Sequence, residues 1–196
     1  MRSDAQRNRK RVLEAAMEAF AVEGLAVPVA DIARRAGVGT GTVSRHFPTK
    51  ESLYEAIVLH LVGGIVDKAR DLSAKNDPGS AFFQFLALMV EQAAVNRGLA
   101  EAISGAGFDV EAVAFHPKHS LEAVESELLA RAQQAGAVRR DITRADVRAL
   151  LVGCLARERQ GCDPEARQRL IDVVCTGLRA EPGTPVGADR VEHSLP

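Results

Sequence analysis

Two short apolar patterns separated by a glycine constrain the fold of this chain more than any other feature. The segment Val29–Phe47, VADIARRAGVGTGTVSRHF, places apolar residues at helical spacing before and after Gly37. Glycine adopts a left-handed backbone conformation without strain, so a tight turn is expected at that position. Pro28 suits the start of a helix, and Pro48 prevents the second helix from continuing. The segment therefore predicts two short helices that meet at a tight turn.

This spacing is that of a helix-turn-helix, whose second helix enters the major groove of DNA. The expected second helix runs from Thr40 to His46 and exposes short polar side chains, which let a helix sit deep in a groove about 12 Å wide. Gly39 and Gly41 cost helix stability, roughly 1 kcal/mol each relative to alanine, as expected where backbone approaches DNA closely. Lys50 opposes the dipole of the following helix, which indicates a phosphate contact. The candidate DNA-binding residues are Thr40, Gly41, Thr42, Ser44, Arg45, His46 and Lys50.

Charge is unevenly distributed, although the whole chain carries a net charge of only −1. Residues 1–50 contain 9 basic and 5 acidic residues, whereas residues 51–196 contain 16 and 21. A positive end on an otherwise acidic chain indicates that this end meets an anion. The asymmetry agrees with DNA as the partner of the N-terminal part.

Composition favours an all-helical cytoplasmic protein. Apolar residues make up 46% of the chain, aromatic residues only 4%, and Ala, Leu, Arg and Glu dominate. The three cysteines form no C-x-x-C pair, which is typical of a reduced compartment. The first twenty residues contain no continuous apolar stretch of a signal peptide, and no later stretch approaches the roughly 18–20 apolar residues of a membrane span.

The rest of the chain shows helical patterns separated by glycine and proline. About nine helices are expected in all, near residues 9–23, 28–36, 40–46, 50–73, 81–96, 99–104, 121–135, 144–160 and 164–179. The expected buried residues are Val12, Leu13, Ala16, Met17 and Phe20 in the first helix, Val29, Ile32, Ala33 and Ala36 in the second, and Val43 and Phe47 at the third. Thr49 is expected to cap the fourth helix. The N-D-P-G-S stretch at 76–80 is expected to form a turn, and residues 105–117 match no single pattern. The proline- and glycine-rich tail, residues 181–196, is expected to be disordered.

The run from Arg9 to Ile57 resembles the DNA-binding domain of the tetracycline-repressor (TetR) family. The matching residues are Ala16, Phe20, Gly24, Asp31–Ala33, Ala36–Val38, Gly41, Thr42, His46, Phe47, Lys50, Glu51 and Leu53. The resemblance implies an all-α regulator with a three-helix DNA-binding domain in residues 1–50. A larger helical ligand-binding and dimerisation domain would follow in residues 51–180. The implied function is that of a ligand-responsive repressor, a homodimer that a small molecule releases from a palindromic operator, with no cofactor.

The resemblance also implies roles for individual residues. Thr40 and Thr42 would face bases or phosphates, Gly41 would permit close approach, and Ser44, His46 and Lys50 would face the DNA backbone. Ser44 stands where the family usually has an aromatic residue, so the phosphate contact of that aromatic residue does not carry over. Gly39 and Thr40 also depart from the usual residues, which means that the base preference of a relative cannot be transferred.

Aromatic residues near the middle of the chain are the best indication of an apolar ligand site. Phe82 and Phe83 are adjacent and point about 100° apart on a helix, so they cannot serve one face equally. Most of these residues are expected in the core. His116 and His119 precede the helix near 121–135, which leaves a role at a ligand entrance open. The candidate ligand-binding residues are Phe82, Phe85, Met89, Phe108, Phe115 and His116.

The last two expected helices carry more apolar surface than one stripe needs. A helix that is apolar on two faces requires two partners, either within its own chain or in a second subunit. The family resemblance favours a four-helix interface between two copies. The candidate interface residues are Val147, Leu151, Cys154, Leu170 and Val174.

Other functional classes have less support. The Gly37–Gly41 stretch lacks the preceding strand and third glycine of a dinucleotide-binding loop. His116 and His119 have no obvious further ligands nearby, so no metal is expected. No nucleophile elbow, zinc-protease motif or acid–base constellation indicates an enzyme. The alternative that the protein binds DNA and dimerises without sensing a ligand remains open, and the absence of an internal cavity would support it.

Overall fold

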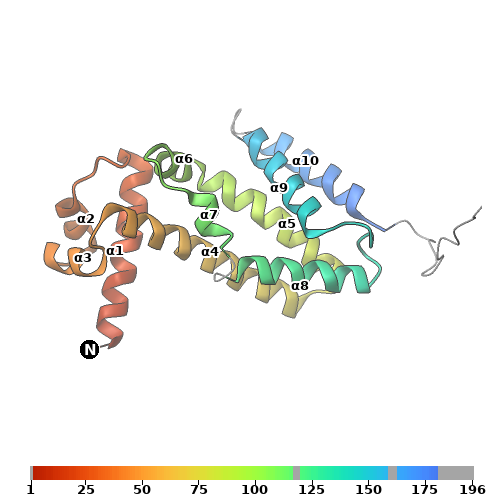
Figure 1. Ribbon diagram of the computed structural model, residues 1–196, viewed down its shortest axis with the longest axis horizontal. Coiled ribbons are helices and arrows are strands. Elements are labelled where there is room, and N and C mark those ends of the chain that lie inside the picture. Colours follow the sequence, from red (N-terminus) through yellow and green to blue (C-terminus); the bar gives the residue numbers. More distant parts are fainter. Residues whose placement is uncertain (1, 117–119, 159–162, 181–196) are drawn as a thin grey trace, which may run out of the picture.

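The computed structural model describes residues 2–116, 120–158 and 163–180, and this part of the chain is all-helical (Figure 1). Within these ranges the only β-type pairing is an isolated antiparallel bridge between Val138 and Arg179. The predicted all-α class is confirmed. The ten helices of the described part are α1 (Arg2–Glu23), α2 (Val29–Ala36), α3 (Thr40–His46), α4 (Lys50–Lys75), α5 (Pro78–Val95), α6 (Arg97–Gly105), α7 (Val110–Ala114), α8 (Leu121–Gln134), α9 (Arg144–Glu158) and α10 (Pro164–Leu178).

Helices α1, α2 and α3 gather at one end of the molecule and are called the N-terminal module (Figure 1). The stripe predicted on α1 is buried, except for the half-buried Met17, and consists of Val12, Leu13, Ala16 and Phe20. Ile32, Ala33 and Ala36 bury one face of α2. Val29 was expected in the same face and is exposed, because it opens the helix between the exposed Pro28 and Ala30.

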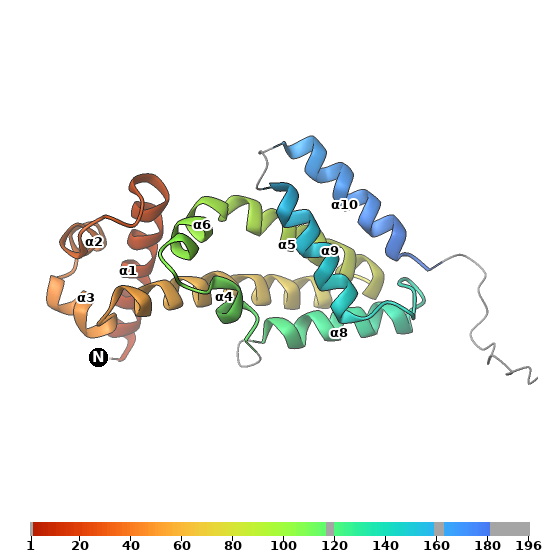
Figure 2. The ribbon, with the colours of Figure 1, turned by 45° about the horizontal axis from the view of Figure 1, so that its top comes forward.

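Helix α4 runs from the N-terminal module into the remaining helices, α5–α10, which are called the C-terminal body (Figure 2). Its start is held by a reciprocal capping box, which confirms the predicted Thr49 cap. The Ser52 N–H donates to Thr49 Oγ1 at 3.1 Å, and the Thr49 N–H donates to Ser52 Oγ at 3.2 Å. Leu53 and Tyr54 pack in the apolar cluster of the N-terminal module. One continuous helix therefore belongs to both parts.

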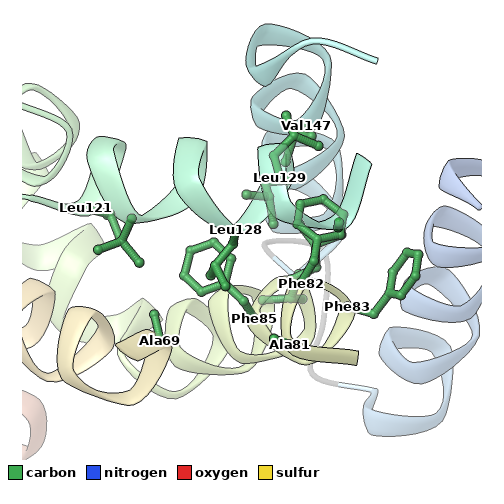
Figure 3. Packing of buried hydrophobic residues seen from close by; sticks show 14 of the residues in the cluster. Ala69, Ala81, Phe82, Phe83, Phe85, Leu121, Leu128, Leu129 and Val147 are labelled. Atoms are coloured by element: carbon green, nitrogen blue, oxygen red, sulfur yellow. The ribbon is translucent and has the colours of Figure 1, made fainter. Parts of the chain in front are cut away.

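The C-terminal body surrounds a second apolar cluster between α4, α5 and α8, with α9 and α10 packed on α5. Figure 3 shows Phe82 and Phe85 among side chains of α8 and α9, including Leu128 and Val147. Phe83 points away from this group toward α10. Phe82 and Phe85 are fully buried. Phe82 therefore packs mainly toward α8 and α9 and Phe83 toward α10, as their angular separation on a helix requires.

Two connections differ from the expected ones. Pro78 is already the first residue of α5, and Asp77 caps the helix by accepting the Ser80 N–H at 3.0 Å. The expected turn at 76–80 is therefore wrong for its last three residues, because proline at a first helical position costs no hydrogen bond. In the stretch without a clear pattern, Asp109 caps the short helix α7. With α7, the described part of the chain has ten helices, one more than expected.

Some expectations fall on parts of the chain outside the described residues. The expectation of a disordered tail concerns residues 181–196, and two further residues named or counted above, Cys162 and His119, also lie outside the described ranges. None of the described helices combines the length and hydropathy that a membrane-spanning segment needs.

Glu125 on α8 is a buried carboxylate at the centre of the C-terminal body. It is 2% exposed, and neither carboxylate oxygen has a hydrogen-bond partner in the described part of the chain. Burial raises the pKa of Glu125, while the charges of Arg144 and Arg148 act in the opposite direction. A buried charge without hydrogen bonds lowers the stability of the fold.

Replacing Glu125 with methionine is expected to raise the free energy of unfolding at neutral pH by about 1–3 kcal/mol. Methionine has a similar length and buries no charge. Because the folded-state pKa of Glu125 is raised, the wild-type protein regains this stability as the pH falls through that pKa toward the ordinary value of 4.5. Urea unfolding at several pH values measures the difference in free energy of unfolding between Glu125→Met and wild type. This difference should be largest at neutral pH and should shrink as the pH falls.

The matched control is Glu127→Met on the same helix, where the carboxylate is exposed and lies 3.8 Å from Arg131. This control should change stability by less than about 0.5 kcal/mol. A Glu125→Met protein less stable than wild type at neutral pH would contradict the prediction and show that the two arginines compensate the buried charge.

Candidate DNA-binding surface and internal cavity

The turn between α2 and α3 requires glycine at position 37 because of its backbone conformation. Gly37 has φ 63° and ψ 38°, which confirms the predicted left-handed conformation. The Val38 N–H donates to the Ala33 carbonyl at 3.0 Å and closes the end of α2. The guanidinium of Arg11 reaches across from α1 and lies against Gly37, but this flexible group could move aside for a larger residue. The turn therefore depends on the backbone geometry of Gly37.

Helix α3 lies at the outer end of the N-terminal module, with one side packed inward (Figure 2). Val43 and the following Phe47 are buried, as predicted. The predicted DNA-binding residues are accessible: Thr40, Gly41, Ser44, Arg45 and Lys50 are exposed, and Thr42 and His46 are half-buried. The arrangement presents a short polar helix face to solvent.

The fold itself does not require the two glycines around Thr40. A Cβ atom at Gly39 would have no atom within 4 Å, and at Gly41 it would meet only the Arg45 side chain at 3.9 Å. Neither residue has a positive φ. Gly39 is the N-cap residue of α3, where glycine is tolerated, whereas Gly41 lies within the seven-residue helix and weakens it. A helical glycine that fills no crowded position is consistent with close approach by an external partner.

Basic side chains from outside α3 lie near its two ends. The guanidinium of Arg9 stands 5.3 Å from the Phe47 ring centroid, and that of Arg11 borders Gly37. Lys50 Nζ donates to the Leu25 carbonyl at 3.4 Å. Sequence reasoning identified Lys50 and missed Arg9 and Arg11. The basic run at 9–11 was the available signal, but only packing of α1 against the turn shows which of these side chains reach α3.

A partly open cavity of about 780 Å³ lies in the C-terminal body next to the N-terminal module. Residues of α4 to α9 line it, and most of the lining is apolar. Its volume falls in the range of sites that bind small organic molecules. Apolar side chains that form its wall include Ile57, Leu61, Val62, Leu99, Ile103 and Leu155.

The predicted ligand-binding residues are only partly brought together by this cavity. Met89, Phe108 and Phe115 line it. Phe82 and Phe85 do not, because the packing of α5 turns them into the core against α8 and α9. His116 is exposed and is not part of the lining either. No cluster of three potential metal ligands occurs in the described residues.

Arg148 of α9 is a cavity residue that sequence reasoning missed. Its guanidinium carbon stands 3.8 Å from the centroid of the Phe115 ring. Its Nη2 donates to Glu111 Oε1 of α7 at 2.9 Å. An arginine in a helical pattern is ordinarily a surface residue, so nothing in the sequence singled it out. Only the approach of α7 to α9 places it at the cavity.

The predicted dimer-interface residues occupy two environments. Val147, Leu151 and Cys154 are buried within the C-terminal body itself, and Leu170 and Val174 are half-buried. The apolar side chains that α9 and α10 leave exposed are instead Leu150, Val152 and Val173. The buried residues face inward because α9 and α10 pack on α5. Leu150 and Val152 lie two positions apart on α9 and so point to nearly opposite sides of the helix, and Val152 also lines the cavity.

Together, the glycine turn, the exposed polar helix and the helical body define the class of helix-turn-helix transcription regulators. Comparison with known families supports this class along most of the chain. Residues 12–57 match the family of bacterial regulatory proteins called the tetR family. Residues 77–180 match the C-terminal domain of SbtR-like transcriptional regulators.

Solved structures agree with the family matches. A TetR transcription regulatory protein from Mycobacterium vanbaalenii is 47% identical, covering 91% of this chain and 99% of its own, with a TM-score of 0.72. A TetR transcriptional regulator from Streptomyces coelicolor is 31% identical, covering 89% and 99%, with a TM-score of 0.68. RolR, solved in complex with resorcinol, shares the fold at 19% identity, covering 92% of both chains with a TM-score of 0.59. This chain belongs to the TetR family of transcription regulators.

Proposed function

We propose that this protein is a ligand-responsive repressor that binds a palindromic operator as a homodimer and leaves it when a small molecule enters the cavity. In this proposal residues 1–50 bind DNA through α3, and residues 51–180 bind the effector and the second subunit. The exposed face of α3 and the cavity supply the two sites that allosteric regulation requires.

The observation that carries the proposal is that the cavity and the N-terminal module share wall residues. Ile57, Leu99 and Ile103 line the cavity and also belong to the apolar cluster of α1, α2 and α3. A molecule that spreads these side chains therefore acts on the packing of the N-terminal module directly.

A row of aromatic rings extends this connection. Phe108 at the cavity meets the Tyr54 ring edge-on at 6.1 Å, and Tyr54 meets the Phe20 ring of α1 at 5.9 Å. Close-packed side chains of this kind have few alternative arrangements, so displacement of one ring is transmitted to the next. RolR, which has the same fold, was solved with a bound small molecule. The cavity favours a sensing protein over a DNA-binding protein that only dimerises.

Homodimerisation is proposed from the surface of α9 and α10. Leu150 of α9 and Val173 of α10 are exposed, and a Cβ atom at Gly153 or Gly177, three and four positions further along the same helices, would have no neighbour within 4 Å. Exposed apolar side chains next to open glycines allow two helices of a second copy to approach closely. A twofold dimer would present two α3 helices to two half-sites of opposite orientation, which explains the expected palindrome.

The experiment that tests the proposal is selection of bound sequences from a random DNA pool with the full-length protein. The expected result is an inverted repeat whose half-sites are spaced by about one turn of DNA or a small multiple. Recovery of no common sequence, or of a single unrepeated half-site, would contradict the proposed dimeric operator binding.

Lys50→Ala is expected to weaken binding to all DNA sequences to a similar extent. The lysine is exposed at the start of α4, where it can reach a phosphate, and a phosphate contact carries no sequence information. The slope of log affinity against log salt should fall by about 1 because one fewer counterion is released. Fluorescence anisotropy at several salt concentrations measures both quantities.

Thr40→Ala provides the contrast for this test. Its side chain is exposed at the first position of α3, the end that meets bases in this motif. The variant should change which bases are preferred at one position of each half-site while leaving the salt slope near its original value. Unchanged base preference in a repeated selection would show that this docking of α3 is incorrect.

A further inference from the structure

The charged groups around the cavity differ in how much they are exposed and in what they contact. Three carboxylates line it, and each already has a partner in the described part of the chain. Glu101 lies 3.9 Å from Arg97, Asp109 accepts the Ala112 N–H at 2.8 Å, and Glu111 accepts from Arg148. All three are exposed residues at the rim. Water and salt therefore screen their charges.

Arg148 is the only cationic residue among the described cavity-lining residues, and its side chain is only 31% exposed. One face of the guanidinium lies on the Phe115 ring, and one N–H group bonds to Glu111. A guanidinium has five N–H donors arranged to bind a carboxylate through two parallel hydrogen bonds. Its other N–H groups make no hydrogen bond to the described residues. The cavity is therefore lined by an oriented guanidinium that can donate further hydrogen bonds to a ligand.

The present partner of Arg148 is held weakly. The side chain of Glu111 is 63% exposed, and it belongs to the five-residue helix α7, which has no buried residue. Ion pairs with an exposed partner contribute only about 0–1 kcal/mol. A carboxylate that enters from the apolar cavity can bond to Arg148 while its apolar part stays among Met89, Phe108 and Ile103.

We propose that the effector of this protein is an amphipathic carboxylate whose anionic group replaces Glu111 on Arg148 and whose apolar part fills the cavity. This inference rests on the proposed function, because it names the chemical class of the molecule that the cavity senses. An organic cation is disfavoured, since the face of the Phe115 ring beside Glu111 is already covered by the Arg148 guanidinium.

The replacement also links binding to movement. Helix α7 contacts α9 through the Glu111–Arg148 pair and packs on α4. When Glu111 is displaced, α7 loses its charged contact to α9. Phe108, which precedes α7, lines the cavity and contacts Tyr54 of α4, is then free to shift. The same α4 begins next to the helix-turn-helix. Effector binding thus acts on the helix that joins the two parts.

The experiment measures binding of three probes of equal chain length to the full-length protein: decanoate, 1-decanol and decyltrimethylammonium. Isothermal titration calorimetry gives affinities, and release of the selected operator gives the functional response. Decanoate is expected to bind at least about tenfold more tightly than the other two, because only a carboxylate gains the charge-assisted hydrogen bonds. Decanoate alone should release DNA.

Two variants make opposite changes at the site. Glu111→Gln removes the competitor of the ligand and should strengthen decanoate binding about two- to fivefold. Arg148→Met should weaken it at least about tenfold, and Arg148→Lys, which keeps the charge without the planar donor pair, should be intermediate. Glu127→Gln is the control, since this exposed carboxylate of α8 pairs with Arg131 outside the cavity lining, and decanoate affinity should stay unchanged.

The sign of the Glu111→Gln effect decides between ligand classes. Weaker binding of decanoate in this variant, or tighter binding of decyltrimethylammonium than of decanoate in the wild type, would overturn the inference. So would equal affinity for 1-decanol, an unchanged affinity in Arg148→Met, or failure of all three probes to bind. These outcomes leave the regulator proposal standing, because that proposal is judged separately by the DNA selection.

Discussion

Replacing Gly41 with leucine is expected to reduce operator affinity at least about 100-fold, a cost of about 2.7 kcal/mol, without destabilising the protein. Gly41 is exposed near the start of α3, and an added Cβ would meet no atom of the chain closer than Arg45 at 3.9 Å. Leucine is a better helix former by roughly 0.5–1 kcal/mol, so thermal stability should stay equal or rise. The bulkier side chain would hold the helix backbone away from the groove and break several base contacts together.

The matched control is Gly98→Leu in α6. Gly98 is also exposed and helical, and a Cβ there would have no neighbour within 4 Å. The Gly98→Leu variant should gain the same helix propensity as Gly41→Leu, and it should bind the operator with wild-type affinity. Thermal melts and fluorescence anisotropy on both variants separate folding from recognition. Operator binding by Gly41→Leu at wild-type strength would mean that α3 does not enter the groove.

Replacing Val173 with aspartate is expected to convert the protein to a monomer and reduce operator affinity by about 100- to 10,000-fold. Val173 is 68% exposed on α10 and so does not support the fold of a single chain. In the proposed four-helix interface it would meet a second copy, where a buried unpaired carboxylate is strongly unfavourable. A monomer binds each half-site separately and loses the gain from linking two binding events.

Val95→Asp is the control for this change, because Val95 is a comparably exposed valine, 77% exposed, and ends α5 rather than belonging to α9 or α10. It should remain dimeric and bind operator normally. Analytical ultracentrifugation gives the oligomeric state, and anisotropy gives the affinity. A Val173→Asp protein that stays dimeric would place the subunit contact on another surface.

The sequence was most informative where structure depends on nearby residues. The bend at Gly37, the Thr49 cap and the bounds of α3 agree with their predictions. Each rests on interactions within a few residues, namely a positive φ, a side chain bonded to the next turn, or a proline that cannot continue a helix. The helix-turn-helix is therefore readable from its own segment.

The residues around the cavity were predicted less well. Three of the six candidate residues line it, and two of the other three, Phe82 and Phe85, form core instead. Aromatic character alone does not distinguish a cavity wall from a packed core, since both favour large apolar side chains. Arg148 carried no sequence signal because its role depends on α7, which lies far from it in the chain.

Most helices, the Thr49 cap, the glycine turn and the polar face of α3 follow from the sequence alone, because those features arise from local backbone preferences and hydrogen bonds over one or two turns. Packing in three dimensions settles which apolar side chains fill the core, which border a cavity and which stay outside on α9 and α10. Helices of similar apolar content pack in many ways, and the choice among them depends on shape complementarity between residues distant in sequence. That packing brought Arg148 to Glu111 and placed Ile57, Leu99 and Ile103 where the two parts of the molecule meet.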